Sequence, residues 1–242
     1  MGNCNNEFER NYKEHSVTYD KQRFEGKDKK YLEFVRADAF WALMPDNKKL
    51  QVLDVGCGTG RGTILIGEQG FHVTGIDLTR EMLDIAEQKK QELGLTNVLF
   101  EQGSAAELPF GDNTFDCVTA FNFIHMFRIK PQKAMIDEMT RVLKPGGTLI
   151  IEFDSFYKAF IMGAVVQKYK SRTHFNKPCD LSYLFDKKVL KIDKVYGAVI
   201  PFMWRFFMHI PQIAINFERF CSRCYPFKYL TERFYVKAVK CD

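Results

Sequence analysis

Apolar residues follow two spacings in the central part of the chain. Short apolar runs rich in β-branched residues are typical of buried strands. Five such runs lie near 51–56, 72–76, 97–101, 115–121 and 147–153. The segments between them repeat apolar residues every three or four positions, as amphipathic helices do. Three of these lie near 61–68, 79–93 and 131–143. The alternation predicts βαβ units and a parallel sheet.

The pattern changes after Phe153. We expect a helix at 180–188 and two further strands at 189–199 and 233–239, which pair antiparallel at the edge of a seven-stranded sheet. The stretch between these strands, at about 201–228, is helical in pattern and carries far more aromatic residues than a connecting turn needs. This composition predicts an insertion that covers a site or contacts a partner.

A helical segment precedes the first strand. Apolar side chains recur at helical spacing from Tyr31 to Leu43, and Pro45 closes the pattern. The whole chain is therefore predicted to be one α/β domain. Its seven-stranded, mostly parallel sheet has helices on both faces, an antiparallel last strand, a helical preface over 1–46 and a helical insertion between the last two strands.

Composition excludes several other classes of protein. Of the 242 residues, 46% are apolar and 27% charged, which is close to a globular average and rules out a disordered or collagen-like chain. The net charge of +5 is too small and diffuse to favour nucleic acid as a partner. Seven cysteines, an odd set, and the lack of an apolar leader favour a cytoplasmic protein.

Neither a membrane span nor a metal site is expected. The apolar run Val195–Ile215 is long enough to cross a bilayer, but Pro201 and Pro211 interrupt its helical hydrogen bonding. We interpret it as a soluble element with peripheral membrane contact at most. Cys221 and Cys224 form a lone pair, whereas a structural zinc site needs four ligands.

The strongest chemical signal follows the first predicted strand. The run D-V-G-C-G-T-G at 54–60 places three glycines between a strand and a helix. Glycines at such a turn let backbone N–H groups approach a ligand, and the helix N-terminus is partly positive. The spacing lacks the final x-x-G of a dinucleotide site, so a nucleoside or a carboxylate fits as well as a phosphate.

A carboxylate ends the second predicted strand. Asp77 stands about twenty residues after the glycine turn, where folds of this kind bind the two hydroxyls of a ribose. The same side chain is also suited to cap the helix that follows. The spacing favours ribose and hence an adenosine-type ligand.

Four motifs follow one another in order. They are D-V-G-C-G-T-G at 54–60, G-I-D-L-T-R-E-M-L-D-I-A at 75–86, L-P-F-G-D-N-T-F-D-C-V at 108–118 and V-L-K-P-G-G-T-L-I-I-E at 142–152. Their order and spacing resemble class I S-adenosylmethionine-dependent methyltransferases, in the branch of the methyltransferase-11 and quinone C-methyltransferase proteins. The resemblance is close over 50–155 and holds only in outline elsewhere.

This resemblance implies a Rossmann-like fold, S-adenosyl-L-methionine as cofactor, and in-line methyl transfer to a small acceptor that is hydrophobic, lipid-like or a natural product. It also implies a single methyltransferase domain over 1–242, with a lid at 1–46, a cofactor-binding core at 50–155 and an acceptor-side part at 156–242. Within that last part, 201–228 is expected to roof the acceptor pocket. A peripheral membrane contact or a homodimer contact through this stretch is the alternative.

The resemblance also assigns contacts to the cofactor. The residues implied are Asp54, Gly56, Cys57, Gly58, Asp77, Leu78, Met82, Ser104, Ala105 and Asn122. Ser104 stands where many relatives carry Asp, so its neutral oxygen is a weaker partner for adenine. In the preface, Tyr19 and Arg36 are candidate contacts to the methionyl carboxylate, with a packed aromatic ring and a solvated charge as the alternatives.

Candidate catalytic residues follow the fourth predicted strand. Asn122 is expected to position cofactor or acceptor, and His125 to act as a general base, since an unperturbed histidine titrates near neutral pH. The alternative for His125 is a packed histidine at a helix start. Glu152 and Asp154 end the fifth strand, where they bind or deprotonate an acceptor, or are simply solvated.

Three other functions remain to be weighed. A non-catalytic S-adenosylmethionine-binding regulator or assembly protein has the same glycine turn and Asp77. A nucleotide-dependent oxidoreductase is disfavoured because the dinucleotide spacing is absent. An arsenic methyltransferase needs converging thiolates, whereas Cys57 lies inside the glycine turn.

Overall fold

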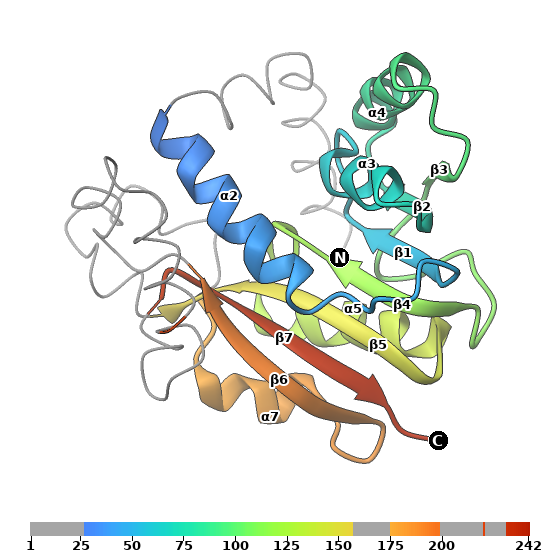
Figure 1. Ribbon diagram of the computed structural model, residues 1–242. Coiled ribbons are helices and arrows are strands. Elements are labelled where there is room, and N and C mark those ends of the chain that lie inside the picture. The colour runs from blue at the N-terminus through green and yellow to red at the C-terminus, as the bar shows by residue number, and fades with distance from the viewer. Residues whose placement is uncertain (1–26, 157–174, 199–219, 221–230) are drawn as a thin grey trace.

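Seven strands form one mixed sheet in the computed structural model, which describes residues 27–156, 175–198, 220 and 231–242 (Figure 1). The strands are β1 (Gln51–Val55), β2 (His72–Asp77), β3 (Val98–Gln102), β4 (Phe115–Ala120), β5 (Leu143–Asp154), β6 (Leu190–Ala198) and β7 (Arg233–Lys240). Their order is β3-β2-β1-β4-β5-β7-β6. The first five run parallel, and β7 is antiparallel to both β5 and β6. The predicted fold class is confirmed.

Helices cover both faces of this sheet. They are α2 (Lys27–Trp41), α3 (Arg61–Glu68), α4 (Arg80–Glu92), η1 (Ile124–Met126), α5 (Ile129–Val142), η3 (Pro178–Asp180) and α7 (Leu181–Leu184). Successive side chains of a strand point to opposite faces, so Val52 packs with α2 and α3 while Leu53 packs with α5 and α7. Burial on both faces explains why these strands are nearly continuous apolar runs.

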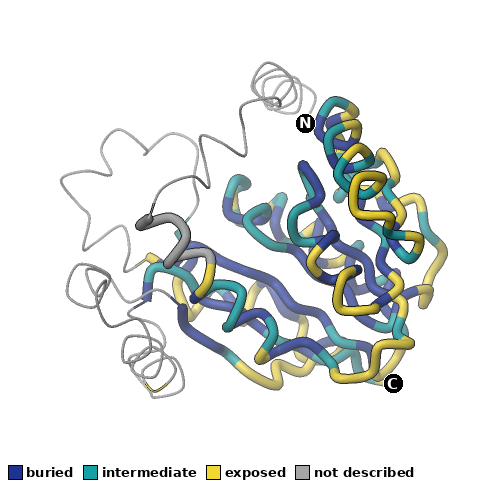
Figure 2. The backbone as a smooth tube through the Cα atoms, turned by 45° about the horizontal axis from the view of Figure 1, so that its top comes forward, coloured by how far each residue is buried: buried dark blue, intermediate teal, exposed yellow. Residues whose placement is uncertain are grey.

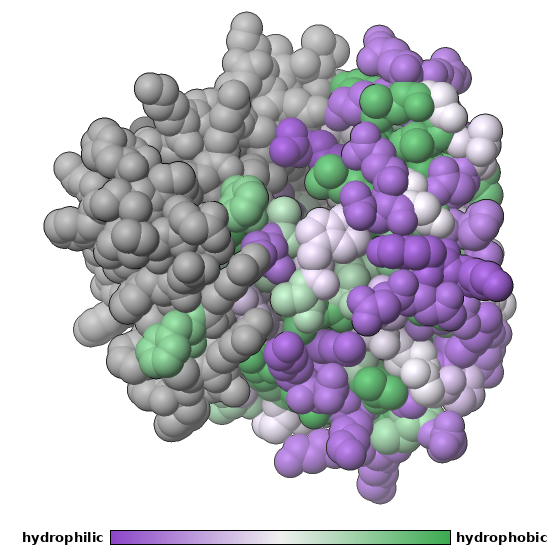
Figure 3. Space-filling model, viewed as in Figure 1, coloured by the Kyte–Doolittle hydropathy of each residue, from purple (hydrophilic) through white to green (hydrophobic). Residues whose placement is uncertain are grey.

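The burial pattern follows these layers. In Figure 2 the central strands are buried, whereas exposed residues gather on outer helix surfaces and in connecting turns. On the face seen in Figure 3 the described surface is mostly hydrophilic, with apolar side chains grouped over α3 and α4. Leu65 of α3 and Leu93, which follows α4, are exposed apolar residues.

Two predicted boundaries are wrong. The helix expected at 180–188 ends at Leu184, because Phe185 is extended and Asp186 folds the chain back by accepting the backbone N–H of Lys188 at 2.9 Å. The fifth strand begins at Leu143 rather than 147. Its Pro-Gly-Gly run forms an irregularity inside the strand, where the pairing shifts between Phe115 and Cys117.

Several predictions lie outside the described residues. These are the contact of Tyr19, most of the lid and the insertion at 201–228 apart from Phe220. The division into lid, core and acceptor-side part stays a prediction. Among the helices of the described segments, none combines the length and apolar content that crossing a bilayer requires.

Candidate functional site

The glycine turn after β1 has a backbone that side chains rarely tolerate. Gly56, Gly58 and Gly60 have φ of 71°, 54° and 75°, all in the left-handed region. At Gly56 an added Cβ would lie only 2.3 Å from the ring of Phe123. At Gly58 the space is open, with no atom within 4 Å of such a Cβ. The turn therefore exposes backbone at Gly58 and is closely covered at Gly56.

Asp77 is fixed across this turn by two backbone groups. Its Oδ2 accepts the N–H of Gly58 at 2.8 Å, and its Oδ1 accepts the N–H of Thr79 at 2.9 Å. The second bond satisfies the start of α4, so the capping interpretation holds in part. Burial raises the pKa of Asp77, and these two N–H groups counteract that effect. The carboxylate keeps further lone pairs for a ligand.

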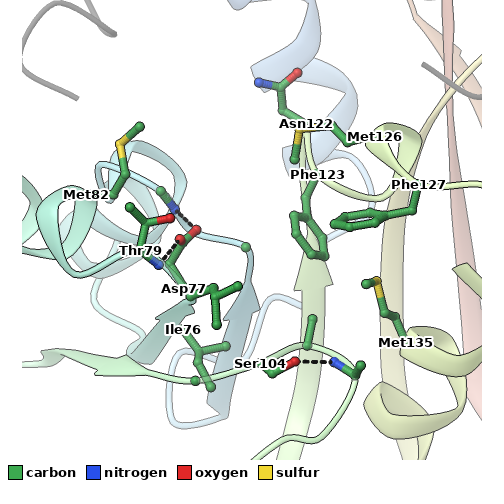
Figure 4. A pocket seen from close by; sticks show the side chains of 16 residues that line it. Ile76, Asp77, Thr79, Met82, Ser104, Asn122, Phe123, Met126, Phe127 and Met135 are labelled. Atoms are coloured by element: carbon green, nitrogen blue, oxygen red, sulfur yellow. Dashed lines mark hydrogen bonds between the residues drawn. The ribbon is translucent and has the colours of Figure 1, made fainter. Parts of the chain in front are cut away.

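Asp77 lines a cavity of about 120 Å³, here called cavity A (Figure 4). Asp77, Thr79 and Met82 form one side, and the other is apolar and contains Phe123, Phe127 and Met135. Ser104 lies at the end of the cavity between these two sides. The predicted site residues on its wall are Gly56, Gly58, Asp77, Leu78, Met82, Ser104, Ala105 and Asn122.

A second cavity, of about 280 Å³ and here called cavity B, lies against the same turn. Helix α2 contributes Arg36, Phe40 and Trp41 to its wall. Asp54 and Glu152 come from the ends of β1 and β5, and Cys57 comes from the glycine turn. Gly56, Gly58 and Asn122 line both cavities. A single elongated ligand can therefore lie across the glycine turn with one end in each cavity.

Asp54 is a buried carboxylate at the inner wall of cavity B. It is 3% exposed and accepts hydrogen bonds from the hydroxyls of Thr63 at 2.7 Å and Thr119 at 3.0 Å. Burial outweighs these two bonds and raises the pKa of Asp54 to about 6. A cationic group of a ligand in cavity B would favour its charged form.

Glu152 is fully buried and, unlike Asp54, is hydrogen-bonded to positively charged side chains. Arg36 donates two hydrogen bonds to it, both at 3.0 Å, and Arg233 donates a third at 3.1 Å. Burial raises the pKa of Glu152, but the charges of Arg36 and Arg233 outweigh it and hold the pKa well below its usual range. The interpretation of Glu152 and Arg36 as solvated charges is wrong, and so is that of Asp154, which is 4% exposed and bound to Arg233 at 3.2 Å.

His125 lines neither cavity. It lies in η1 and is 5% exposed, although its neighbours Asn122 and Met126 reach the wall of cavity A. Sequence reasoning missed the apolar residues Phe123, Phe127 and Met135 of that wall. The first two follow Asn122 directly in the loop after β4, so their position was available in the sequence, whereas Met135 arrives from the middle of α5.

Two cysteines, one just after β1 and one in β4, are poorly suited to thiolate chemistry. Burial, with the negative charges of Asp77 and Asp54, raises the pKa of Cys57 well above its usual range, and burial raises that of Cys117 to about 12. Both side chains are therefore thiols near neutral pH. Within the described ranges, no three His, Cys, Asp or Glu side chains are grouped closely enough to hold a metal ion.

Comparison with known proteins agrees with this geometry. Residues 52–147 match a family model described as a methyltransferase domain. Demethylmenaquinone methyltransferase of Listeria welshimeri is 43% identical over 111 residues, 44% of this chain and 46% of that protein. The Bacillus cereus protein of the same name is 44% identical over 104 residues, 41% of this chain and 43% of that protein. The chain thus spans a little less than half the length of these curated relatives.

Solved structures extend the likeness over nearly the whole fold. A magnesium protoporphyrin IX methyltransferase from Synechocystis with bound SAH has a TM-score of 0.72 and 16% identity, covering 97% of this chain and 99% of its own. A possible histamine N-methyltransferase from Thermotoga maritima has a TM-score of 0.66 and 18% identity, covering 95% and 98%. Identities this low establish the fold alone.

The sheet order places the glycine turn and Asp77 at one edge of a fold that is shared with solved S-adenosylmethionine-dependent methyltransferases. Residues 52–147 are thus the part of the chain that is similar to known methyltransferase domains.

Proposed function

We propose that the chain transfers a methyl group from S-adenosyl-L-methionine to a small hydrophobic acceptor. The observation that carries this proposal is the pair of cavities that meet at the glycine turn, with Asp77 in cavity A and Asp54 in cavity B. The cofactor is long and carries hydroxyls near one end and an ammonium at the other. Two carboxylates on either side of an exposed backbone turn match that arrangement.

Cavity A suits the adenosine part of the cofactor. Asp77 would accept the ribose hydroxyls, since two backbone bonds leave lone pairs of its carboxylate unused. Met82 and Leu78 supply apolar surface beside an adenine ring. Ser104 already accepts the backbone N–H of Ala106 at 3.2 Å, and its hydroxyl remains able to donate to a ring nitrogen.

Cavity B suits the methionyl part. Its inner wall carries Asp54, whose charged form a ligand ammonium would favour. The open space at Gly58 lets the ligand backbone approach the turn closely. Arg36 and Tyr19 remain predicted contacts to the methionyl carboxylate of the cofactor. Arg36 would then bind this carboxylate and Glu152 at the same time.

The bound cofactor supplies a methyl group on a sulfonium, which is already an activated leaving group. The chain then contributes mainly by holding two reactants in line, an effect worth roughly 7–11 kcal/mol in well-oriented models. The apolar wall of Phe123, Phe127 and Met135 would exclude water and favour a hydrophobic acceptor. Glu152, held as a carboxylate by two arginines, is a weak base, and His125 lines neither cavity, so we propose no base from either.

The acceptor class follows from the relatives' names and the apolar wall. We propose a hydrophobic ring such as a demethylated quinone, in keeping with the curated relatives named demethylmenaquinone methyltransferases. Contact of 201–228 with this acceptor, with a membrane surface or with a second copy stays part of the proposal. Cytoplasmic location likewise stays a prediction.

The test is turnover by the purified full-length chain. The protein is incubated with S-adenosylmethionine and a short-chain demethylmenaquinone, and both released S-adenosylhomocysteine and the mass of the acceptor are measured. An acceptor heavier by one methyl group supports the proposal. Tight cofactor binding with no turnover on any of a panel of quinones, phenols and amines would support a non-catalytic binding protein instead.

A further inference from the structure

One buried carboxylate joins four segments of the chain beside the two cavities. Glu152, at the end of β5, is 0% exposed. It accepts hydrogen bonds from Arg36 of α2, from Arg233 and Tyr235 of β7, and from the backbone N–H of Asn122 after β4. The methyltransferase proposal uses Arg36 of this cluster but assigns no role to Glu152; the cluster is here called the Glu152 hub.

The bond to Asn122 is the contact through which the hub reaches the ligand site. It is the shortest of the set, at 2.7 Å, and it is charge-assisted. Asn122 has φ of 53°, a left-handed conformation that residues with side chains rarely adopt unless their surroundings enforce it. The backbone after β4 is therefore held in an unfavourable conformation by a fixed anion.

The conformation of Asn122 determines where the next side chain lies. The ring of Phe123 rests on Gly56, so close that a Cβ there would overlap it. Asn122 itself lines both cavities, and Phe123 lines cavity A opposite Asp77 (Figure 4). The loop and the glycine turn thus bound the region where the two cavities adjoin, here called the passage.

We infer that Glu152 is a positioning residue: with Arg36 and Arg233 it holds the Asn122–Phe123 backbone against the glycine turn and so sets the width of the passage in which the cofactor's sulfonium lies. This inference rests on the proposed function and deepens it. Helix α2 is tied to the same carboxylate through Arg36, so the position of α2 over cavity B and that of the loop are coupled.

Charge explains why an amide is a poor substitute at this position. Arg36 and Arg233 bring two positive charges into a buried region, and Glu152 and Asp154 balance them. Glu152→Gln keeps the size and one acceptor oxygen but leaves an excess positive charge between α2 and β7. An uncompensated buried charge strongly disfavours the original arrangement, so α2 and the loop are expected to separate.

The experiment compares Glu152→Gln with the wild-type full-length chain. Affinity for S-adenosylhomocysteine is measured by calorimetry, which needs no acceptor, and hydrogen exchange is followed over 121–127 in the ligand-free protein. We expect at least a tenfold loss of affinity and faster exchange in 121–127, with exchange in β1 and β3 unchanged. Weaker binding with unchanged exchange in the free protein would contradict the inference, because it would indicate that Arg36 binds the ligand directly.

Asp116→Asn is the matched control. Asp116 also accepts a side-chain ammonium, from Lys144 at 2.8 Å, and a backbone N–H, from Gln51 at 2.9 Å. It lies at the opposite end of the strands, away from both cavities. Its variant is expected to bind S-adenosylhomocysteine within twofold of wild type.

A double variant separates positioning from general stability. If Glu152 acts through the placement of Phe123, the affinity losses of Glu152→Gln and Phe123→Leu are less than additive when combined. Simple addition of the two losses would contradict the inference. Should Glu152→Gln fail to fold, Arg36→Lys keeps the charge but cannot make two hydrogen bonds in the same geometry, and at least a threefold loss with faster exchange in 121–127 is expected.

The outcomes distinguish the two proposals. A folded Glu152→Gln or Arg36→Lys variant with wild-type affinity and unchanged exchange in 121–127 overturns the positioning inference alone. A wild-type chain that binds neither S-adenosylmethionine nor S-adenosylhomocysteine overturns the proposed function, and the inference with it.

Discussion

Three carboxylates near the carboxyl ends of β1, β2 and β5 have different partners, and the partners influence their protonation. Asp54 accepts only from neutral hydroxyls, so burial raises its pKa to about 6. Asp77 accepts from backbone N–H groups and from the side chain of Thr79, and burial raises its pKa as well. Glu152 faces two arginines, and its pKa is held low. A ligand cation therefore finds its electrostatic partner at Asp54, whereas the charge of Glu152 is already used within the protein.

Replacing Asp54 by Asn is expected to stabilise the fold at neutral pH while weakening the binding of S-adenosylmethionine. Its pKa rises from 3.8 to about 6 on folding, so the folded state holds the proton more tightly. The resulting stabilisation is fully present below pH 3.8 and is lost as the pH rises through about 6. Asp54→Asn is therefore expected to raise the free energy of unfolding at neutral pH by about 1–3 kcal/mol.

Urea denaturation at several pH values checks this sign. The gain from Asp54→Asn should shrink toward zero as the pH falls to 3.8, while affinity for S-adenosylmethionine drops at neutral pH. Asp116→Asn provides the opposite sign, because burial raises the pKa of Asp116 but the hydrogen bonds from Lys144 and the backbone N–H of Gln51, with the charge of Lys144, together outweigh it and lower the pKa. A neutral-pH loss of stability in Asp54→Asn would contradict the argument.

Asp77 is the residue whose removal should most directly abolish cofactor binding. Asp77→Ala deletes the acceptor for the ribose hydroxyls and leaves the N–H of Gly58 without this partner. Hydrogen bonds to a charged group contribute about 1.5–3 kcal/mol each, so affinity should fall at least tenfold. Calorimetry with S-adenosylhomocysteine measures it, and unchanged affinity would remove Asp77 from the ribose site.

Among the elements, turns and helix ends depend on contacts that join distant parts of the chain. The ring of Phe123 can pack on the glycine turn only because Gly56 has no Cβ. Helix α5 ends at Val142, and Lys240 of β7 donates to the carbonyl oxygens of Thr140 and Leu143 at 2.8 and 2.6 Å. The final turn of α5 is thus satisfied by the last residue of β7.

Two glycines of the turn offer a matched comparison. Gly58→Ala and Gly56→Ala both place a side chain at positive φ, which costs about 1–2 kcal/mol. Only at Gly56 does the added Cβ also meet a ring, at 2.3 Å. We expect thermal denaturation to show a clearly larger loss for Gly56→Ala, and Phe123→Leu to relieve part of it. Equal losses at the two positions would show that the ring is not fixed there.

Lys240→Met tests the contact that ends α5. The methionine keeps the apolar stem but donates no hydrogen bond, so four acceptors lose this donor, including the side-chain oxygen of Asn113 at 2.8 Å. A loss of about 1–2 kcal/mol in the free energy of unfolding is expected, with cofactor affinity unchanged. Chemical denaturation and calorimetry measure the two quantities separately.

For the whole molecule, local pattern predicted the sheet and most helices. Strands buried on both faces are nearly continuous apolar runs, whereas helices buried on one face repeat apolar residues every three or four positions. The errors came from local chemistry: Asp186 turns the chain where periodicity continues a helix, and the Pro-Gly-Gly run remains inside β5 as an irregularity. Asp54 was predicted from the family resemblance and Asp77 from its spacing after the glycine turn, and each lines a cavity, while their contacts with the cofactor stay predictions. The Glu152 hub was missed because Arg36 lies 116 residues away along the chain, a pairing that no local pattern reveals.

The position of β7 affects the order in which the protein can assemble during synthesis. β7 lies between β5 and β6, and β6 has no other partner in the described sheet. A growing chain that has emerged only through Ala198 therefore carries every motif of the glycine turn and Asp77, yet its sixth strand has nowhere to pair. Arg233 and Tyr235 also arrive with β7, so the charge of Glu152 stays partly uncompensated until then. The chain should accordingly acquire full cofactor affinity only once residues 233–240 are free to pair with β5 and β6, and a fragment that ends at Ala198 should bind the cofactor more weakly.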